Sequence, residues 1–352
     1  MSLEFRTTTE RDSPAVAAFI KNVFGITGDL PAVEPKHLHW KCWEEHPSWN
    51  GSHGFVMTQD EEIVAHVTAM PLTCRIEGRE VRILHFMDWA AKRGTGAGME
   101  IMRRAGESVD FVFAAGGTAA ALKGLLKLGY RQCSPIACYA RPLRPIRRLS
   151  ANIDPLKRPS AWRTAAQVAR SSMWKWKAPS LPVTGWTVRR LEGNQLMTEQ
   201  FPLPPATSQV LGFKRSPEIL RYFLKCPSTP MELFLIYKDG MVRGYFMLAY
   251  APAQARIVDS WVDSTDTADW NILFELAVRQ SLQHADVAEV VSATTDEFIG
   301  HRLLDCGFHW RANIPLPWRS FTGNVFPDTP LRFQMIDGDV AFLRTGFADF
   351  WG

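Results

Sequence analysis

A glycine-rich turn between an apolar run and a predicted helix constrains this chain more than any other feature. The turn reads Arg93-Gly94-Thr95-Gly96-Ala97-Gly98, and it follows the apolar run of residues 83–90. Glycine lets a backbone approach a ligand closely, and the N–H groups and dipole at a helix start favour an anion. The turn therefore predicts a phosphate-binding cradle. A plain strand–turn–helix corner would use similar glycines, so the surrounding pattern has to decide.

The segments around this turn alternate between strand and helix patterns. Strands are indicated by short apolar runs between turn residues, and helices by apolar positions at helical spacing after capping residues. In chain order we expect a strand at 3–6, a helix at 15–24, hairpins at 54–70 and 74–90, a helix from residue 99, a strand at 109–114 and a helix at 118–128.

This order, with R-x-x-G-x-G after a fourth strand, resembles the GNAT superfamily of acyl-CoA N-acyltransferases. The resemblance covers residues 1–140 and implies a mixed, mostly antiparallel central sheet flanked by helices. It also implies acetyl-CoA or another acyl-CoA as co-substrate, with no metal. The residues that it assigns to the cofactor are Trp89, Ala90, Arg93, Gly94, Thr95, Gly96, Ala97 and Gly98.

The second half of the chain repeats the first at an offset of about 180 residues. The matching segments are 38–47 with 220–227, 63–66 with 241–244, Asp88 with 258–261, and 125–130 with 303–308. Matches in register along the chain indicate a duplicated unit. We therefore expect an α/β (α+β) chain of two tandem GNAT-like modules. Its predicted parts are a first module at 1–140, a basic linker at 141–181, and a degenerate second module with a C-terminal hairpin at 182–352.

The two modules differ where the cofactor would bind. The segment 263–270 matches the glycine-rich turn but contains no glycine, and it carries Asp263, Asp266 and Asp269. Carboxylates would repel a pyrophosphate, and side chains would keep the backbone away from it. We therefore expect one CoA per chain, bound to the first module.

The predicted linker carries most of the positive charge. Residues 141–177 contain ten Lys or Arg and one acid, Asp154, so this segment sums to +9 and the rest of the +4 chain to −5. After Ser160 the pattern is helical, with an apolar stripe edged by Arg163, Arg170 and Lys177. The stripe consists of Trp162, Ala165, Ala166, Ala169, Met173 and Trp176. Such a helix either straps the two modules together or contacts an anionic surface such as a membrane.

The catalytic residues are less well defined. Asp88 ends the fourth strand directly before the cradle, and burial near the apolar run would raise its pKa toward that of a general base. Alternatively, Asp88 caps the strand or pairs with Lys92 or Arg93. The tyrosine acid of the GNAT pattern is missing, because Leu125 and Leu303 stand at its place.

The acceptor class follows from the predicted groove between the modules. Glu44, Glu45 and Asp259 would give that groove a negative field, which suits an amine on a small molecule or peptide. Two alternatives remain open: a Fem-like enzyme that uses an aminoacyl or acyl-carrier donor, and a binding protein without turnover. No nucleic-acid motif is present, and we expect no nucleic-acid partner. Six scattered cysteines without an export signal indicate a cytoplasmic protein with reduced thiols.

Two further motifs are assigned structural roles. The segment His37-x-His39, with Cys42 and His46, has histidine spacing compatible with a metal, but its aromatic setting favours a helix on the acceptor side. Asp337-Gly338-Asp339 lies between two apolar segments and is predicted to be the turn of the C-terminal hairpin.

Overall fold

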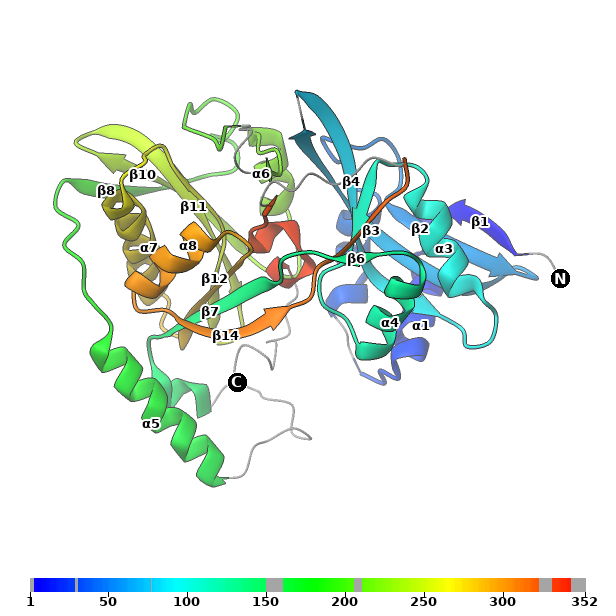
Figure 1. Ribbon diagram of the computed structural model, residues 1–352, viewed down its shortest axis with the longest axis horizontal. Helices are drawn as coiled ribbons and strands as arrows, with labels where there is room; N and C mark the ends of the chain where they lie inside the picture. The colour runs from blue at the N-terminus through cyan, green and yellow to red at the C-terminus, as the bar shows by residue number, and fades with distance from the viewer. Residues whose placement is uncertain are drawn as a thin grey trace.

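The computed structural model describes residues 3–28, 31–76, 78–149, 161–205, 211–322 and 331–342. Its fold is built on two seven-stranded sheets in two neighbouring lobes, each flanked by helices (Figure 1). This confirms the predicted fold class. Asp154, like the rest of linker residues 150–160, lies outside the described residues.

The first sheet contains most strands of the N-terminal half. Its order is β1 (Glu4–Thr7), β2 (Gly54–Gln59), β3 (Glu62–Ile76), β4 (Arg79–Ala91), β5 (Phe111–Phe113), β15 (Pro317–Ser320) and β6 (Arg131–Gln132). The β1–β4 meander is antiparallel, and β5 pairs parallel with β4. The long hairpin strands β3 and β4 form at the apolar runs that predicted them.

The second sheet contains most strands of the C-terminal half. Its order is β14 (His309–Ile314), β7 (Ile136–Pro142), β13 (Glu289–Thr294), β12 (Gln254–Val262), β11 (Met241–Ala251), β10 (Met231–Lys238) and β8 (Trp186–Leu191). Again the pair next to the hairpin strands, β12 and β13, is parallel. A short parallel pair joins β9 (Leu211–Gly212) to β16 (Leu331–Arg332).

Each half of the chain contributes a strand to the other half's sheet. β7 follows the first-module strands in sequence but pairs with β13 and β14, whereas β15 pairs with β5 and β6. In Figure 1 the segments that join β6 to β7 and β14 to β15 run between the lobes for this reason. Because the two sheets exchange strands, membership of a sheet does not follow chain order. The division of the chain at residues 140 and 182 therefore stays a prediction.

Eight α-helices lie among the described residues. They are α1 (Ser13–Phe24), α2 (Pro35–Cys42), α3 (Ala97–Gly106), α4 (Ala119–Lys127), α5 (Ala161–Lys177), α6 (Pro217–Leu224), α7 (Thr267–Leu282) and α8 (Glu297–Asp305). None of the helices in the described part of the chain is both long and apolar enough to cross a membrane.

The internal repeat appears as a symmetric contact between α2 and α6. The Trp40 indole donates to the Tyr222 carbonyl at 3.0 Å, and the Tyr222 hydroxyl donates to the Trp40 carbonyl at 2.8 Å. Their rings stack with centroids 5.1 Å apart. Because the sequence matches Trp40 with Tyr222, this is a two-fold contact inside one chain, in which equivalent residues bind each other.

The predicted C-terminal hairpin does not form among the described residues. Two 3-10 turns, η5 (Met335–Asp337) and η6 (Asp339–Ala341), replace it, and Gly338 between them is extended. The predicted hairpin turn is replaced by a buried structure, in which Asp337 is fully buried and its carboxylate accepts from the Gln334 N–H at 2.9 Å. The segment is therefore part of the core between the two lobes.

Candidate functional site

The predicted cradle forms a sharp turn between β4 and α3. Gly94 and Gly96 have φ angles of 80° and 71°, in the left-handed region that favours glycine. A Cβ atom on either residue would meet nothing within 4 Å, so the turn borders open space. Arg93 beside it is exposed.

The first turn of α3 faces this space, and its N-cap residue provides no side-chain cap. Gly96 is its N-cap residue and has no side chain to satisfy the first N–H groups of the helix. The Thr95 hydroxyl accepts from the Ala97 N–H at 3.3 Å and donates to the Lys92 carbonyl at 2.9 Å. Such a helix start can bind an anion through its remaining N–H groups.

Gly98 allows α3 to pack closely on β4. A Cβ at Gly98 would lie 2.7 Å from the Ala91 Cβ, and the Trp89 indole donates to the Gly98 carbonyl at 2.9 Å. Trp89 therefore fixes the helix start, and Ala90 beside it is buried in the strand. The structure thus brings the sequence-predicted residues 89–98 together at one corner.

The strands part just below this corner. The parallel pairing of β4 with β5 ends at His85 and Phe113, so residues 86–91 of β4 continue without β5 beside them. The register of β3 against β4 also shifts between His66 and Thr68, opposite Asp88, which has a φ angle of 50°. A bulge of this kind bends the strand and redirects its side chains and backbone groups.

Asp88 lies in this bulge and is not a free carboxylate. Its side chain forms an ion pair with Lys41, which is 2% exposed and also donates to the Ala32 carbonyl at 3.1 Å. Burial opposes ionisation of Asp88, but the charge and hydrogen bond of Lys41 outweigh it and lower the pKa. The expected rise in pKa is therefore wrong, and the partner is Lys41 rather than Lys92 or Arg93.

Neutral histidines surround the Asp88–Lys41 pair. The His66 Nδ1 lies 3.4 Å from the Asp88 carbonyl oxygen. Burial lowers the pKa of His66 to about 4 and that of His37 to about 3, so both rings are neutral at pH 7. Lys41 was not identified from the sequence. Its position between the apolar residues Trp40 and Cys42 was a signal that this lysine is buried.

The predicted acceptor carboxylates do not share one groove. Asp259 is fully buried and paired with Arg215, whereas Glu44 forms an ion pair with Lys225 from the other half of the chain. A cavity of 350 Å³ does lie between the two halves beside α2 and α6. It is lined by Glu45, Pro47, Met197, Glu218, Arg221, Tyr222 and Lys225. Its charges are mixed, so the expected negative field is not found there.

The helix start in the second half is capped by its own carboxylates. The Asp266 side chain accepts from the Ala268 N–H at 2.9 Å at the start of α7. Asp269 accepts from the Ser264 hydroxyl at 2.7 Å and pairs with Lys238 at 2.9 Å. At the start of α3 in the first half, the corresponding N-cap residue is Gly96, which has no side chain there.

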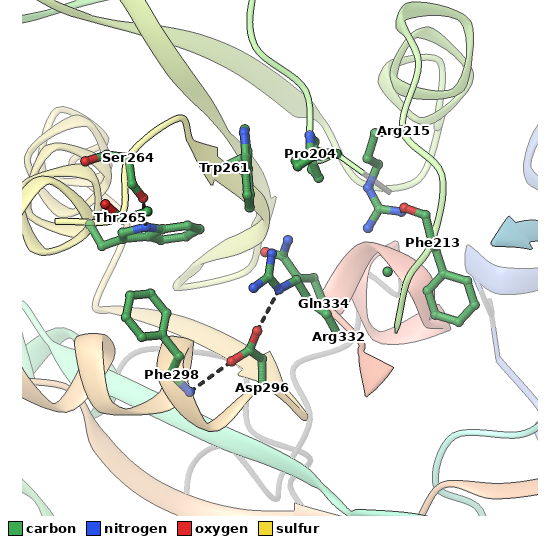
Figure 2. Close-up of a pocket in the computed structure, with 13 residues that line it drawn as sticks. Pro204, Phe213, Arg215, Trp261, Ser264, Thr265, Asp296, Phe298, Arg332 and Gln334 are labelled. Atoms are coloured by element: carbon green, nitrogen blue, oxygen red, sulfur yellow. Dashed lines mark hydrogen bonds and ion pairs between the residues drawn. The ribbon is translucent and has the colours of Figure 1, made fainter. Parts of the chain in front are cut away.

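A cavity of 460 Å³ lies beside that second helix start (Figure 2). Four aromatic rings contribute to its walls, and the Arg332 guanidinium lies 5.4 Å from the ring centroid of Trp261. The residues that line it are Pro204, Pro205, Gly212, Phe213, Arg215, Trp261, Ser264, Thr265, Trp270, Asp296, Phe298, Arg332 and Gln334. Arg332 pairs with Asp296 at 2.6 Å, so the cation nearest the aromatic wall is already neutralised.

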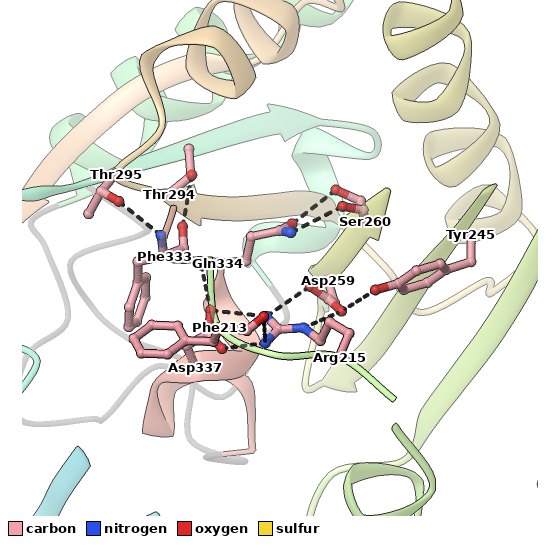
Figure 3. Close-up of polar contacts among 10 residues, drawn as sticks. All are labelled: Phe213, Arg215, Tyr245, Asp259, Ser260, Thr294, Thr295, Phe333, Gln334 and Asp337. Atoms are coloured by element: carbon pink, nitrogen blue, oxygen red, sulfur yellow. Dashed lines mark hydrogen bonds and ion pairs between the residues drawn. The ribbon is translucent and has the colours of Figure 1, made fainter. Parts of the chain in front are cut away.

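A buried network of hydrogen bonds adjoins this cavity through Arg215 (Figure 3). Arg215 donates to Asp259 at 2.9 Å and to Asp337 at 3.0 Å, and the Tyr245 hydroxyl donates to Asp259 at 2.8 Å. Burial raises the pKa of Asp337 to about 6, although Arg215 acts in the opposite direction. The network joins η5 to β12 and has a structural role.

Comparison with solved structures identifies the architecture. A probable N-acyltransferase from Enterococcus faecalis V583 superposes with a TM-score of 0.56 and 14% identity, over 91% of this chain and 72% of its own. A GCN5-related N-acetyltransferase from Anabaena variabilis gives 0.57 and 11%, over 91% and 73%. A tandem GNAT protein from the clavulanic acid biosynthesis pathway gives 0.54 and 13%, over 92% and 100%. The chain has the GNAT fold.

At these identities the likeness establishes the fold alone. No protein-family model matches the chain, and no curated protein matches it by sequence. Among the described residues, no three His, Cys, Asp or Glu side chains form a group that could hold a metal ion. Within the GNAT fold, the Arg93–Gly98 turn lies directly after the fourth strand of the first sheet, as the sequence predicted.

Proposed function

We propose that this protein is an acyl-CoA-dependent N-acyltransferase, most simply an N-acetyltransferase, with one acyl-CoA site per chain in its first half. The observation that carries this proposal is the uncapped start of α3 at Gly96, beside the exposed Arg93. The equivalent helix start in the second half is capped by Asp266, which supports a single site. The proposed acceptor is an amine on a small molecule or peptide.

The proposed reaction transfers the acyl group directly. The amine nitrogen forms a bond to the thioester carbon, the C–S bond breaks, and the nitrogen loses a proton. A backbone N–H beside the β4 bulge would stabilise the oxyanion. Leu125 cannot protonate the departing thiolate, so the thiolate leaves as an anion or takes a proton from water.

Asp88 is the residue that we propose to act on the amine. Because its pKa is lowered, it is ionised at neutral pH and a weak base. Its proposed part is to attract and hold the ammonium group, with water as the final proton acceptor. Lys41 would fix the carboxylate in the bulge. Asp88→Asn should therefore lower kcat/KM by about tenfold or more.

A double variant separates a chemical role of Asp88 from a structural one. Asp88→Asn alone leaves Lys41 buried without its counterion, which could disturb the site by itself. In Asp88→Asn with Lys41→Met, no charge is stranded. If the carboxylate acts on the substrate, the double variant stays as slow as the single one. Recovery of activity in the double variant would show that Asp88 only neutralises Lys41.

Binding of acyl-CoA can be tested by calorimetry with acetyl-CoA. The wild type should bind one equivalent, and Gly96→Asp should abolish binding by placing a carboxylate at the helix start. Gly240→Asp is the matched control, because Gly240 also has a positive φ and open space, but lies in the β10–β11 turn. The proposal fails if the wild type does not bind or if both variants bind equally.

A binding protein without turnover is the second candidate. Leu125 in place of an acid and the engagement of Asp88 by Lys41 favour it. A panel of amines assayed for release of free thiol distinguishes the two, because only an enzyme gives acceptor-dependent release. Competition between acetyl-CoA and loaded acyl or aminoacyl carriers tests whether the donor is free CoA.

A further inference from the structure

The helix α5 presents its apolar side to solvent. Trp176 is 84% exposed and Met173 is 45% exposed, and Ala165, Ala166 and Ala169 on the same stripe are exposed as well. If α5 were a strap between the lobes, this stripe would be the face that packs on the protein. The structure places it outward.

The opposite side of α5 holds the helix on the second sheet. Ser171 is fully buried, and the Trp174 ring stacks on His309 of β14 with centroids 4.2 Å apart. The Arg311 guanidinium lies 4.6 Å from the ring centroid of Trp174 on the same side. The outward direction of the stripe is thus set by packing of the inner face. In Figure 1 α5 runs along the outer side of the second lobe.

Arg170 and Lys177 edge the exposed stripe, and Lys175 is exposed on another side of the same helix end. Arg170, Lys175 and Lys177 are all exposed, and no acidic residue occurs between residues 161 and 177. Arg141 and Arg144, by contrast, are used inside the fold, where they donate to Glu275 and to carbonyls after α7. The charge of α5 is therefore directed to the outside, and α5 alone carries four positive charges on a chain whose net charge is +4.

We propose that α5 binds the surface of an anionic lipid bilayer. Its stripe extends about 21 Å from Trp162 to Trp176, at about 1.5 Å per residue, which is long enough to lie flat on a surface. Tryptophan prefers the interface between headgroups and acyl chains, and lysine and arginine bind anionic headgroups. An anionic bilayer satisfies both the apolar stripe and its cations. The second lobe would then face the membrane.

Flotation with lipid vesicles tests this proposal directly. The intact chain should float with vesicles of equal parts phosphatidylglycerol and phosphatidylcholine at 0.1 M salt, and not with phosphatidylcholine alone. Trp176→Ala with Met173→Ala should weaken binding on the order of tenfold, since two of the stripe's large side chains are lost. Lys175→Glu with Lys177→Glu should weaken it by a similar factor, and raised salt should do the same.

Two controls match these variants. Trp310→Ala removes another exposed tryptophan, on β14, whose neighbour His309 is the residue that faces α5. Lys123→Glu with Lys127→Glu makes the same charge change on α4. Both control variants should float like the wild type, and circular dichroism should show all variants folded.

Several results would overturn the proposal. These are the absence of flotation, equal binding to phosphatidylcholine alone, and an equal loss in the control variants. Light scattering gives a further test. If the protein is a dimer and Trp176→Ala dissociates it, a second copy of the chain covers the stripe. Calorimetry with acetyl-CoA is independent of these outcomes, so the proposed enzymatic function can fail or stand separately.

Discussion

Five buried histidines make the stability of this fold dependent on pH. Burial lowers the pKa of each one, to about 3 or about 4, from an ordinary value of 6.5. These residues are His37, His46, His53, His66 and His85. Above pH 6.5 they are neutral in both the folded and the unfolded chain. As the pH falls below 6.5, only the unfolded chain takes up protons, so the free energy of unfolding decreases.

The size of this effect follows from the shifts. At pH 5.5, one unit below the unfolded pKa, each histidine costs about 1.4 kcal/mol, and five cost about 7 kcal/mol relative to pH 8. The buried Asp337 and the partly exposed Asp339 act in the opposite direction, because desolvation raises the pKa of Asp337 to about 6 and that of Asp339 to about 7. When the pH falls from 8 to 5.5, protonation of these two acids in the folded chain increases the free energy of unfolding by about 3 kcal/mol. The net expected loss is about 4 kcal/mol.

Urea denaturation at pH 8 and at pH 5.5, at equal ionic strength, measures this difference. His85→Leu should reduce this difference in unfolding free energy by about 1.4 kcal/mol, because it removes the buried imidazole that stacks on Phe113. His301→Leu, on the exposed side of α8, is the control and should leave the difference unchanged. Equal or greater stability at pH 5.5 would refute the reasoning.

Two further substitutions test the packing between the halves. Arg215→Met leaves two buried carboxylates without their cation and should cost about 3 to 5 kcal/mol, whereas Lys214→Met at an exposed ion pair should cost less than about 1 kcal/mol. Similar losses in the two variants, measured by urea denaturation, would contradict a structural role of the network. Gly106→Ala would place a Cβ 2.3 Å from the Phe321 ring and should cost about 1 to 3 kcal/mol. Gly193→Ala, which meets no atom within 4 Å, is its control in thermal melts, and equal melting temperatures for the two would show that α3 has more room than the structure gives it.

The local elements could be predicted because their signals lie within a few residues. The hairpin β3–β4 and the glycine-rich turn before α3 form where periodicity and turn residues indicated, and α2 forms in the aromatic segment that was expected to be a helix. The same holds for the corner of residues 89–98, which is made by one continuous segment.

Contacts between distant segments could not be predicted from these patterns. The pairing of Asp88 with Lys41 depends on how α2 lies against β4, and the exchange of β7 and β15 depends on the packing of both sheets. The apolar stripe of α5 was recognised, but periodicity does not say whether a stripe faces protein or solvent. For the same reason, Asp337 was predicted to lie in a hairpin turn, and its burial beside Arg215 was not foreseen.

The most direct test of the central claim is a crystal of the chain soaked with acetyl-CoA. We predict one molecule per chain, with its pyrophosphate against the backbone of residues 93–98 and its thioester at the bulge of β4. Pyrophosphate density against residues 263–270, or acetyl-CoA in the cavity beside Trp261, would contradict the single site in the first half of the chain.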